Sequence, residues 1–202
     1  MNERVTLLKK IIIIPGSQRK QSINHYLALY LQSLLKAHCD AELLDVATID
    51  LPLFNQDLES NAEVLTKVHA LHRPLWNADG LIVVGPEYNG SYSPFLKNTV
   101  DWVSRLPRLP GGQDYPNPFH GKAMLLGSAT PGRSGGLLGL QNTRNLFAYL
   151  GALILAEQIS IPHANDAWDD AGLLREVCLN AQVTNTLQVF LNLIENITSS
   201  TR

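Results

Sequence analysis

Long apolar runs and cysteines are both scarce in this sequence of 202 residues. No segment reaches the roughly 20 apolar residues that a membrane-spanning helix needs, and the apolar run at 11–14 lacks the length and the cleavage region of a secretory signal peptide. The two cysteines, Cys39 and Cys178, lie far apart and lack the spacing of a metal or dithiol site, so we interpret them as packed thiols. We therefore predict a cytoplasmic protein without a membrane segment.

An excess of positive charge is also missing, because the formal net charge is −2 and the pI is about 6.3. Such a surface has no large basic field that would draw the protein onto nucleic acid or an acidic membrane, and we predict neither partner. His69 and His72 lie three apart on a predicted helix but have no close third ligand, so we interpret them as a solvated face and not as a metal site. Hydrolase chemistry gets no support, because the G-x-S-x-G pattern is absent.

Apolar segments of strand length alternate with helical patterns along the chain, in which 45% of the residues are hydrophobic. Such alternation is typical of stacked βαβ units, which form a parallel sheet covered by helices on both faces. We predict strands at 7–14, 42–46, 80–85, 123–128 and 153–160. We predict helices at 23–37, 62–76, 94–104 and 137–150, a last helix inside 169–197, and N-caps at Ser22, Asn61 and Ser93. The expected architecture is a single α/β domain over residues 1–202.

A turn rich in hydrogen-bond donors follows the first predicted strand. Its residues 16–24 read Gly-Ser-Gln-Arg-Lys-Gln-Ser-Ile-Asn and open directly into a helix. Helix N-terminal N–H groups, hydroxyl and amide side chains and an arginine can together hold a phosphate, although an ordinary strand-to-helix turn favours the same residue types. The pattern argues against a dinucleotide fingerprint, because Gln18 and Gln21 stand where G-x-G-x-x-G needs glycines.

A longer and more specific pattern follows the third predicted strand. Residues 86–105 read Pro-Glu-Tyr-Asn-Gly-Ser-Tyr-Ser-Pro-Phe-Leu-Lys-Asn-Thr-Val-Asp-Trp-Val-Ser-Arg. A flat heteroaromatic ring needs a wall to lie against and backbone groups for its polar edge, and this loop with Tyr88 and Asn89 can supply both. In a doubly wound sheet of order 2-1-3-4-5, the crevice lies between the carboxyl ends of strands one and three. Both patterns fall there, so we predict a flavodoxin-like, doubly wound five-stranded sheet of this order.

A glycine-rich segment follows the fourth predicted strand at 130–136 and reads Thr-Pro-Gly-Arg-Ser-Gly-Gly. Its small residues and free N–H groups can close over the same crevice, although a strand-to-helix turn alone can require such glycines. Since the other two loops border that crevice, we predict that this third loop meets the ligand.

The first two patterns, GSQRKQSIN and PEYNGSYSPFLKNTVDWVSR, resemble the NADPH-dependent FMN reductase family, which includes related quinone, azo-dye and chromate reductases. The segment TPGRSGG is similar to a later glycine-rich loop of that family, so the resemblance reaches from the first strand through the helix after the fourth. The resemblance implies FMN as the cofactor, NADPH or NADH as the co-substrate, and assembly as a homodimer or homotetramer.

The resemblance also implies which residues hold FMN. Those for the phosphate would be Ser17, Arg19, Ser22 and Asn24, and those lining the isoalloxazine ring would be Pro86, Glu87, Tyr88, Asn89 and Ser91. From the third loop we add Thr130, Gly132 and Gly135. Thr130 stands where the family usually has serine, which keeps the hydroxyl, and Ser134 replaces a commonly bulkier residue. We expect no metal ligand and no catalytic side chain, because the flavin carries the chemistry.

These inferences favour an NAD(P)H-dependent oxidoreductase that passes electrons through FMN, by ping-pong hydride transfer, to a quinone, free flavin or similar small acceptor. A flavodoxin-type electron carrier is one alternative, but we would expect a strongly acidic surface on it, and the near-neutral charge and Arg19 disfavour it. A flavin-dependent sensor or interaction module is the other alternative, which steady-state NAD(P)H oxidation with a quinone would exclude.

The connection at 105–121 is rich in proline and glycine and longer than is usual in a compact domain, so we expect it to affect the choice of acceptor. In the helix before it, the spacing of Asp101 and Arg105 permits an ion pair. Trp102 is either a core or an interface residue. We give this helix a structural and oligomeric role.

Overall fold

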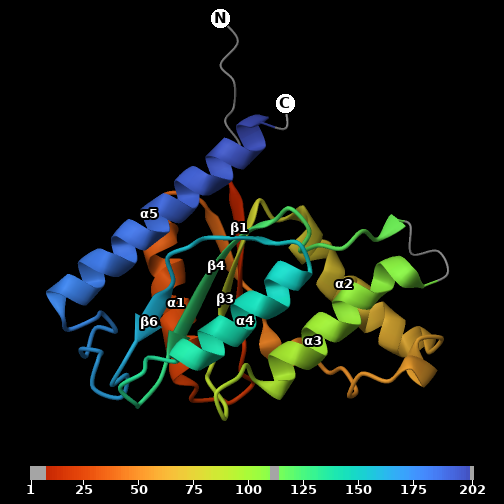
Figure 1. The fold of residues 1–202 in the computed structure, drawn as a ribbon, viewed down its shortest axis with the longest axis horizontal. Coiled ribbons are helices and arrows are strands. Elements are labelled where there is room, and N and C mark those ends of the chain that lie inside the picture. The colour runs from red at the N-terminus through yellow and green to blue at the C-terminus, as the bar shows by residue number, and fades with distance from the viewer. Residues whose placement is uncertain (1–7, 110–113, 201–202) are drawn as a thin grey trace, which may run out of the picture.

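The computed structural model describes residues 8–109 and 114–200, and its elements follow the predicted alternation of strand and helix (Figure 1). The strands are β1 (Lys10–Pro15), β2 (Asp40–Leu43), β3 (Gly80–Val84), β4 (Ala123–Ala129), β5 (Leu153–Ile154) and β6 (Ile159–Ile161). The α-helices are α1 (Ile23–Leu35), α2 (Ala62–Asn77), α3 (Pro94–Arg105), α4 (Leu137–Tyr149) and α5 (Val177–Ser200). Three short 3₁₀ helices are η1 (Val46–Thr48), η2 (Gln56–Leu58) and η3 (Leu106–Arg108).

The strands form a parallel sheet in the order β2-β1-β3-β4-β5, which confirms the predicted order. The predicted strand at 153–160 is instead two short strands, β5 and β6, and both pair with β4. Between them the chain turns away from β4, where Arg144 of α4 donates to the carbonyl of Ala156 at 3.2 Å. The second strand ends at Leu43, earlier than predicted, because the Asp45 carboxylate accepts from the N–H of Ala47 and starts η1.

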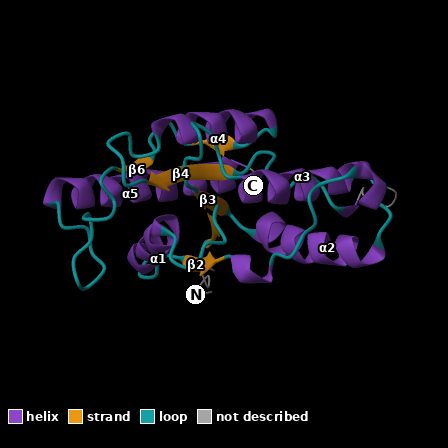
Figure 2. Cartoon of the chain, turned by 90° about the horizontal axis from the view of Figure 1, so that it is seen from below, coloured by secondary structure: helices purple, strands orange, loops and turns teal. Residues whose placement is uncertain are grey.

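Alternate residues of each central strand point to opposite faces of the sheet, where two separate cores lie. In β1, Ile11 and Ile13 pack with α1 and α5, whereas Ile12 and Ile14 pack with α2, α3 and α4. Figure 2 shows α1 on the other side of the strands from α2 and α3. Burying one such side chain contributes about 1.5–3 kcal/mol, so a shift of β1 by one residue would be strongly unfavourable.

The helix starts follow the predicted caps. The Asn61 side chain accepts from the N–H groups of Glu63 and Val64, and the Ser93 hydroxyl accepts from the N–H of Leu96 at 3.1 Å. Ser22 occupies the N-cap position of α1, but its side chain makes no capping bond.

In helix α3, the partners of Asp101 and Arg105 differ from the expected ones, and Trp102 lies in the core. Asp101 pairs with Lys97 at 2.6 Å and Arg105 pairs with Glu59, so each residue has another partner than the one that their spacing permits. Trp102 is a core residue at 1% exposure, and its Nε1 donates to the carbonyl of Pro52 at 2.8 Å.

The interpretation of His69 and His72 as a solvated face is wrong. His72 is buried, with its Nε2 2.7 Å from the carbonyl oxygen of Pro116, and the ring of His69 packs on that of Tyr115 with 4.1 Å between centroids. The two histidines lie beside the connection after α3, which covers them. In the described part of the chain, no three metal-ligating side chains gather, at these histidines or elsewhere.

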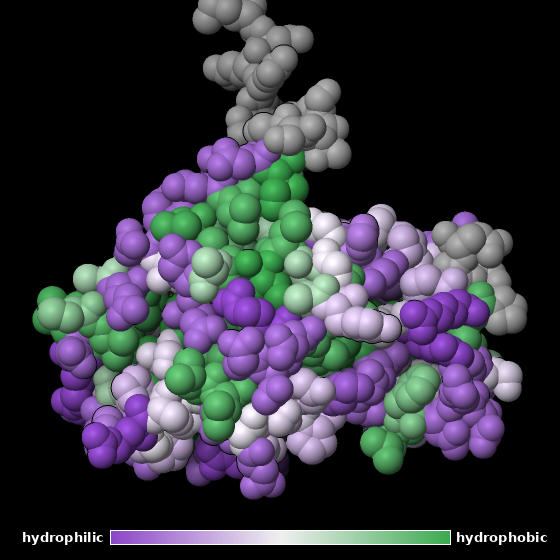
Figure 3. Space-filling model, in the orientation of Figure 1, coloured by the Kyte–Doolittle hydropathy of each residue, from purple (hydrophilic) through white to green (hydrophobic). Residues whose placement is uncertain are grey.

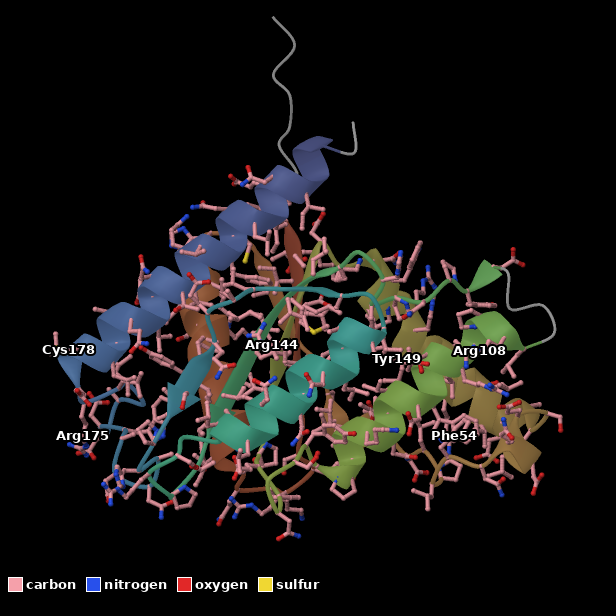
Figure 4. The ribbon with its side chains drawn as sticks, viewed as in Figure 1. Phe54, Arg108, Arg144, Tyr149, Arg175 and Cys178 are labelled. Carbon is pink, nitrogen blue, oxygen red and sulfur yellow. The ribbon has the colours of Figure 1, made fainter. Side chains whose placement is uncertain are left out.

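The two cysteines differ from each other. Cys39 is buried, as predicted, and burial raises the pKa of its thiol to about 11. Cys178 is exposed in the first turn of α5, so its interpretation as a packed thiol is wrong (Figure 4). Among the helices in residues 8–109 and 114–200, none has the length and apolar character to span a membrane.

The connection from α3 to β4 lies at the amino edge of the sheet, because it ends where β4 begins (Figure 1). Residues 110–113 of this connection lie outside the described residues. The predicted loops after β1, β3 and β4 lie at the opposite, carboxyl edge. Within one chain, the described parts of the connection therefore do not border those loops, and its effect on acceptor choice stays a prediction.

Candidate functional site

Three loops meet at the carboxyl edge of the sheet, at the lower side of Figure 1 and facing the viewer in Figure 2. They follow β1, β3 and β4, and we call them the first, second and third loops: residues 16–22, 85–93 and 130–136. The strand order reverses between β1 and β3, which is where doubly wound sheets hold their ligands. All the sequence-predicted site residues lie on these three loops or in the first turn of α1.

Close backbone packing joins the first loop to the second. The N–H of Gly16 donates to the carbonyl of Val84 at 2.7 Å. A Cβ at Gly16 would lie 2.9 Å from the Cα of Gly85, so a side chain at Gly16 would push the loops apart. The buried Ser93 hydroxyl donates to the carbonyl of Gly16 while it caps α3. This second role of Ser93 carried no signal in the sequence beyond its place as a cap.

The first turn of α1 presents unpaired donors. The N–H groups of His25 and Tyr26 both donate to the carbonyl of Ser22. Those of Ile23 and Asn24 have no partner in the described part of the chain. Free N–H groups at a helix N-terminus, together with the helix dipole, favour an anion. A phosphate there would satisfy both donors.

A hollow of about 290 Å³ lies against the first loop. Its lining includes Ser17 and Arg19, two of the predicted phosphate ligands, together with Lys20 and His25. The buried Ser17 hydroxyl accepts from the N–H of Arg19 at 3.3 Å, whereas the Arg19 side chain is exposed. Asp45 is the one carboxylate of the lining, so the hollow is cationic on balance.

Asn24 connects the first loop to the end of β4. Its Nδ2 donates to the carbonyl of Ala129 at 2.9 Å, and its Oδ1 accepts from the N–H of Ala129 at 2.9 Å. The side chain is 3% exposed, and both of its polar groups are used by these bonds. Asn24 can therefore offer a phosphate its backbone N–H and the second hydrogen of Nδ2, while the amide also holds the end of β4.

The second loop forms a tight two-residue hairpin turn. The N–H of Tyr88 donates to the carbonyl of Ser91 at 2.8 Å, and the N–H of Ser91 donates back to Tyr88 at 3.0 Å. Asn89 and Gly90 between them have φ of 51° and 75°, the left-handed pair that an Asn-Gly sequence accepts most easily. Tyr88 is 45% exposed, so an aromatic face is available to a ligand beside the peptide group that joins Asn89 to Gly90.

Glu87 has a partner inside the protein. Its Oε2 accepts from the N–H of Gly139 at 3.0 Å, in the first turn of α4. A carboxylate at a helix N-terminus is stabilised by the helix dipole as well as by the hydrogen bond. Glu87 therefore fastens the second loop to α4.

Two glycines of the third loop pack closely against the hydroxyl groups of Ser160 and Ser128. Gly135 and Gly136 have φ of 59° and 86°. A Cβ on them would lie 2.0 Å from Ser160 Oγ and 2.1 Å from Ser128 Oγ, so the loop needs glycine at both positions. Ser128 Oγ is buried and has no hydrogen-bond partner within residues 8–109 and 114–200. At the start of this loop, the N–H of Thr130 donates to Ile161 at 3.0 Å.

Comparisons with known proteins agree with this geometry. A protein-family model described as NADPH-dependent FMN reductase matches residues 9–166. The chain is 31% identical to a quinone reductase of Escherichia coli over 146 residues, 72% of this chain and 73% of that protein. It is 32% identical to a 2-hydroxy-1,4-benzoquinone reductase of a Burkholderia species over 164 residues, 81% of this chain and 84% of that protein.

A solved structure is similar over nearly the whole chain. The flavoenzyme FerB of Paracoccus denitrificans, an NAD(P)H:(acceptor) oxidoreductase, superposes with a TM-score of 0.79 at 28% sequence identity. The match covers 94% of this chain and 98% of FerB.

Proposed function

Because this chain belongs to the NADPH-dependent FMN reductase family, we propose that it holds FMN at the carboxyl edge of its sheet and reduces quinones with NAD(P)H. Membership of the family makes the chain an oxidoreductase. The placement of FMN, the residues that hold it and the acceptor are our proposals.

The first turn of α1 carries this proposal. Ile23 and Asn24 offer two N–H groups that have no partner within the described residues. Arg19, in the loop that leads into this turn, also lines a hollow that is cationic on balance. A phosphate monoester is doubly charged near neutral pH and has three acceptor oxygens, so it matches this set of donors. The residues present therefore fit the phosphate of FMN. Ser17 and Ser22, both buried at this turn, complete the proposed phosphate site.

The isoalloxazine ring would lie against the second loop. Tyr88 supplies an exposed aromatic face, and the Asn89–Gly90 turn supplies backbone groups for the polar edge of the ring. The other residues proposed to line the ring are Pro86, Glu87, Ser91, Thr130, Gly132 and Gly135. Glu87 would act through the bond that its Oε2 accepts from Gly139.

When bound, FMN accepts hydride from NAD(P)H and passes electrons to the acceptor. The chain's own residues would bind the phosphate and support the ring from the second loop. NAD(P)H and the acceptor would use the same site in turn, so we expect ping-pong kinetics. No side chain is needed as a proton donor, and we assign none.

Quinones are the acceptor class that the relatives support. The Escherichia coli and Burkholderia relatives are both named for quinone reduction. A quinone is a flat ring of a size that can stack on the open face of a flavin. We therefore propose a quinone as the acceptor of this chain.

A homodimer or homotetramer in the cytoplasm remains our prediction for the assembly. It is supported by exposed apolar side chains on α4, where Leu137 and Leu138 are 56% and 59% exposed. Figure 3 shows hydrophobic surface where α4 begins and a larger area between α4 and α5. Light scattering coupled to size exclusion would check it, and a strict monomer at micromolar concentration would contradict it.

Absorbance spectroscopy tests the proposed function in three steps. FMN is added to the purified protein, then NADPH without oxygen, then a quinone. We expect a bound flavin spectrum, bleaching by NADPH and recovery on adding the quinone, with sustained NADPH oxidation at steady state. A protein that does not bind FMN, or a bound flavin that NADPH does not bleach, would contradict the proposal.

A further inference from the structure

We propose that the first two turns of α4 form a seat for the Glu87–Ser91 turn, in which Asn142 and Gly139 are positioning residues for the flavin ring. This inference rests on the proposed function, because it gives the contact between α4 and the Glu87–Ser91 turn a role in holding FMN. Neither residue was identified from the sequence. We call residues 138, 139 and 142 the α4 seat.

Asn142 of α4 binds the carbonyl of Gly90 in the turn. Its Nδ2 donates to the carbonyl of Gly90 at 2.7 Å and to that of Leu138, one turn earlier in α4, at 3.2 Å. The two hydrogens of one amide group are thus divided between the turn and the helix. Because both neighbours are acceptors, a flipped amide would set its oxygen against two carbonyl oxygens, so only one orientation is favourable.

The bond of Glu87 runs in the opposite direction. Its carboxylate belongs to the second loop and accepts from the N–H of Gly139 in α4, whereas Asn142 belongs to α4 and donates to the second loop. The turn is therefore held at both ends of the Glu87–Gly90 segment. The peptide group that joins Asn89 to Gly90, which we propose faces the ring, lies between these two points of attachment.

Gly139 allows the close approach that these bonds need. A Cβ at this position would lie 3.0 Å from Cβ of Glu87 and 3.1 Å from its Cα, so a methyl group would displace the backbone of the loop. Next to it, a Cβ at Gly90 would lie 3.6 Å from Leu138 Cδ1, which places the Leu138 side chain beside the turn. The α4 seat thus contacts the turn by hydrogen bonds and by shape.

The seat also joins the second loop to the third. Helix α4 begins at Leu137, directly after Gly135 and Gly136 of the third loop. Any movement of α4 would therefore shift both walls of the proposed ring site together. By its bond to Gly90, Asn142 fixes the distance between the turn and α4. In our proposal, this distance determines how the turn contacts the ring.

Asn142→Asp is the central test, because it keeps the shape of the side chain but replaces a donor by a carboxylate facing two carbonyl oxygens. We expect FMN to dissociate about tenfold more readily, and the absorption bands of the bound flavin to shift at saturating FMN. Asn145→Asp is the matched control, since it adds the same charge one turn along the same helix, at an exposed residue. We expect the control to bind FMN like the wild type.

Gly139→Ala separates positioning from stability. Alanine in a helix is favoured over glycine by about 0.8–1 kcal/mol, so the melting temperature of the FMN-free protein should fall little or rise. We nevertheless expect weaker FMN binding and a shifted flavin spectrum, because the methyl group displaces Glu87. Should Asn142→Asp fail to fold, Asn142→Leu serves in its place, since it removes the donor without adding a charge.

Hydrogen exchange of the FMN-free protein gives a readout that needs no flavin. The N–H of Ser91, which closes the turn, should exchange faster in Asn142→Asp than in Asn145→Asp or the wild type. Unchanged exchange together with unchanged FMN affinity and spectrum would overturn the proposed seat, as would equal effects of the two aspartate variants. A wild-type protein that binds no FMN would contradict the proposed function instead, and the exchange result would still decide whether α4 holds the turn.

Discussion

The carboxyl and amino edges of the sheet differ in how their backbone polar groups are satisfied. At the carboxyl edge, the N–H groups of Ile23 and Asn24 at the start of α1 have no partner in the described part of the chain. At the amino edge, the end of α2 is occupied, because the Lys122 ammonium donates to the carbonyl of Trp76 at 2.9 Å and to that of Ala78. The start of α1 at the carboxyl edge thus keeps two donors without partners in the described residues, whereas carbonyl groups at the end of α2 at the amino edge are bonded to Lys122.

Side chains brace the loops at both edges, but with different results. At the carboxyl edge, Asn24, Ser93 and Glu87 each bond to the backbone of a neighbouring segment, and the N–H groups of Ile23 and Asn24 stay without a partner in the described residues. At the amino edge, Asn117 donates to the carbonyl of Leu150 at the end of α4 and accepts from the N–H of Phe119 in its own connection. A rigid frame around unsatisfied donors is the arrangement that a ligand site requires.

The largest effect is expected from replacing Asn24, which holds the loops at the carboxyl edge, by alanine. Asn24→Ala leaves the N–H and the carbonyl of Ala129 buried without partners, and we expect a loss of about 3 kcal/mol in the free energy of unfolding. FMN affinity should fall as well, because the first and third loops lose their connection. Urea denaturation and FMN titration measure the two effects.

Asn117→Ala is the matched variant at the amino edge, since it also removes two bonds to backbone groups. We expect it to lower stability by about 1 kcal/mol or more and to leave FMN affinity unchanged. Equal losses of FMN affinity in the two variants would contradict the distinction between the edges.

Arg19→Ala tests the phosphate site without touching the frame. Loss of a charge-assisted contact should weaken FMN binding by about 1.5–3 kcal/mol, whereas stability should stay the same because the side chain is exposed. The difference from wild type should shrink at high salt. Arg108→Ala, at an exposed arginine beyond α3, provides the control (Figure 4). An unchanged FMN dissociation constant for Arg19→Ala would remove this residue from the site.

Gly16→Ala tests the close packing of the first and second loops. The new Cβ would meet the Gly85 backbone at 2.9 Å, and we expect a loss of about 1–3 kcal/mol in stability together with weaker FMN binding. Gly85→Ala is its control, because the nearest atom to a Cβ there is 3.8 Å away. If both variants were equally stable, the contact at Gly16 would not limit the approach of the loops.

The smallest effect is expected from pH at the amino edge. Burial, and next the neighbouring His72, lower the pKa of His69 below its ordinary 6.5. As pH falls through the region just below 6.5, the unfolded chain takes up protons that the folded protein does not, so stability should decline there. In urea denaturation at a series of pH values, His69→Gln should show a smaller decline in stability than the wild type. The two proteins should bind FMN with equal affinity. An unaltered pH profile in the variant would count against this assignment.

The sequence was sufficient for the central strands and the positions of the three loops, because strand periodicity and turn residues are local signals. The sheet order followed from where the first two loops fall in a doubly wound sheet. The sequence predicted the caps at Asn61 and Ser93 and the place of Asn89–Gly90 from local signals as well. It missed contacts that depend on distant elements, such as the bond of Asn142 to Gly90, 52 residues away. Arg105 shows the same limit, since its partner is Glu59 and not its helical neighbour Asp101.

Hydrogen exchange of the wild-type protein with and without FMN tests the central claim most directly. We predict that FMN slows exchange in peptides covering the first turn of α1, the Glu87–Ser91 turn and the third loop, and leaves peptides covering 114–122 unchanged. Protection at the amino edge, or FMN binding that leaves the first turn of α1 unprotected, would contradict it.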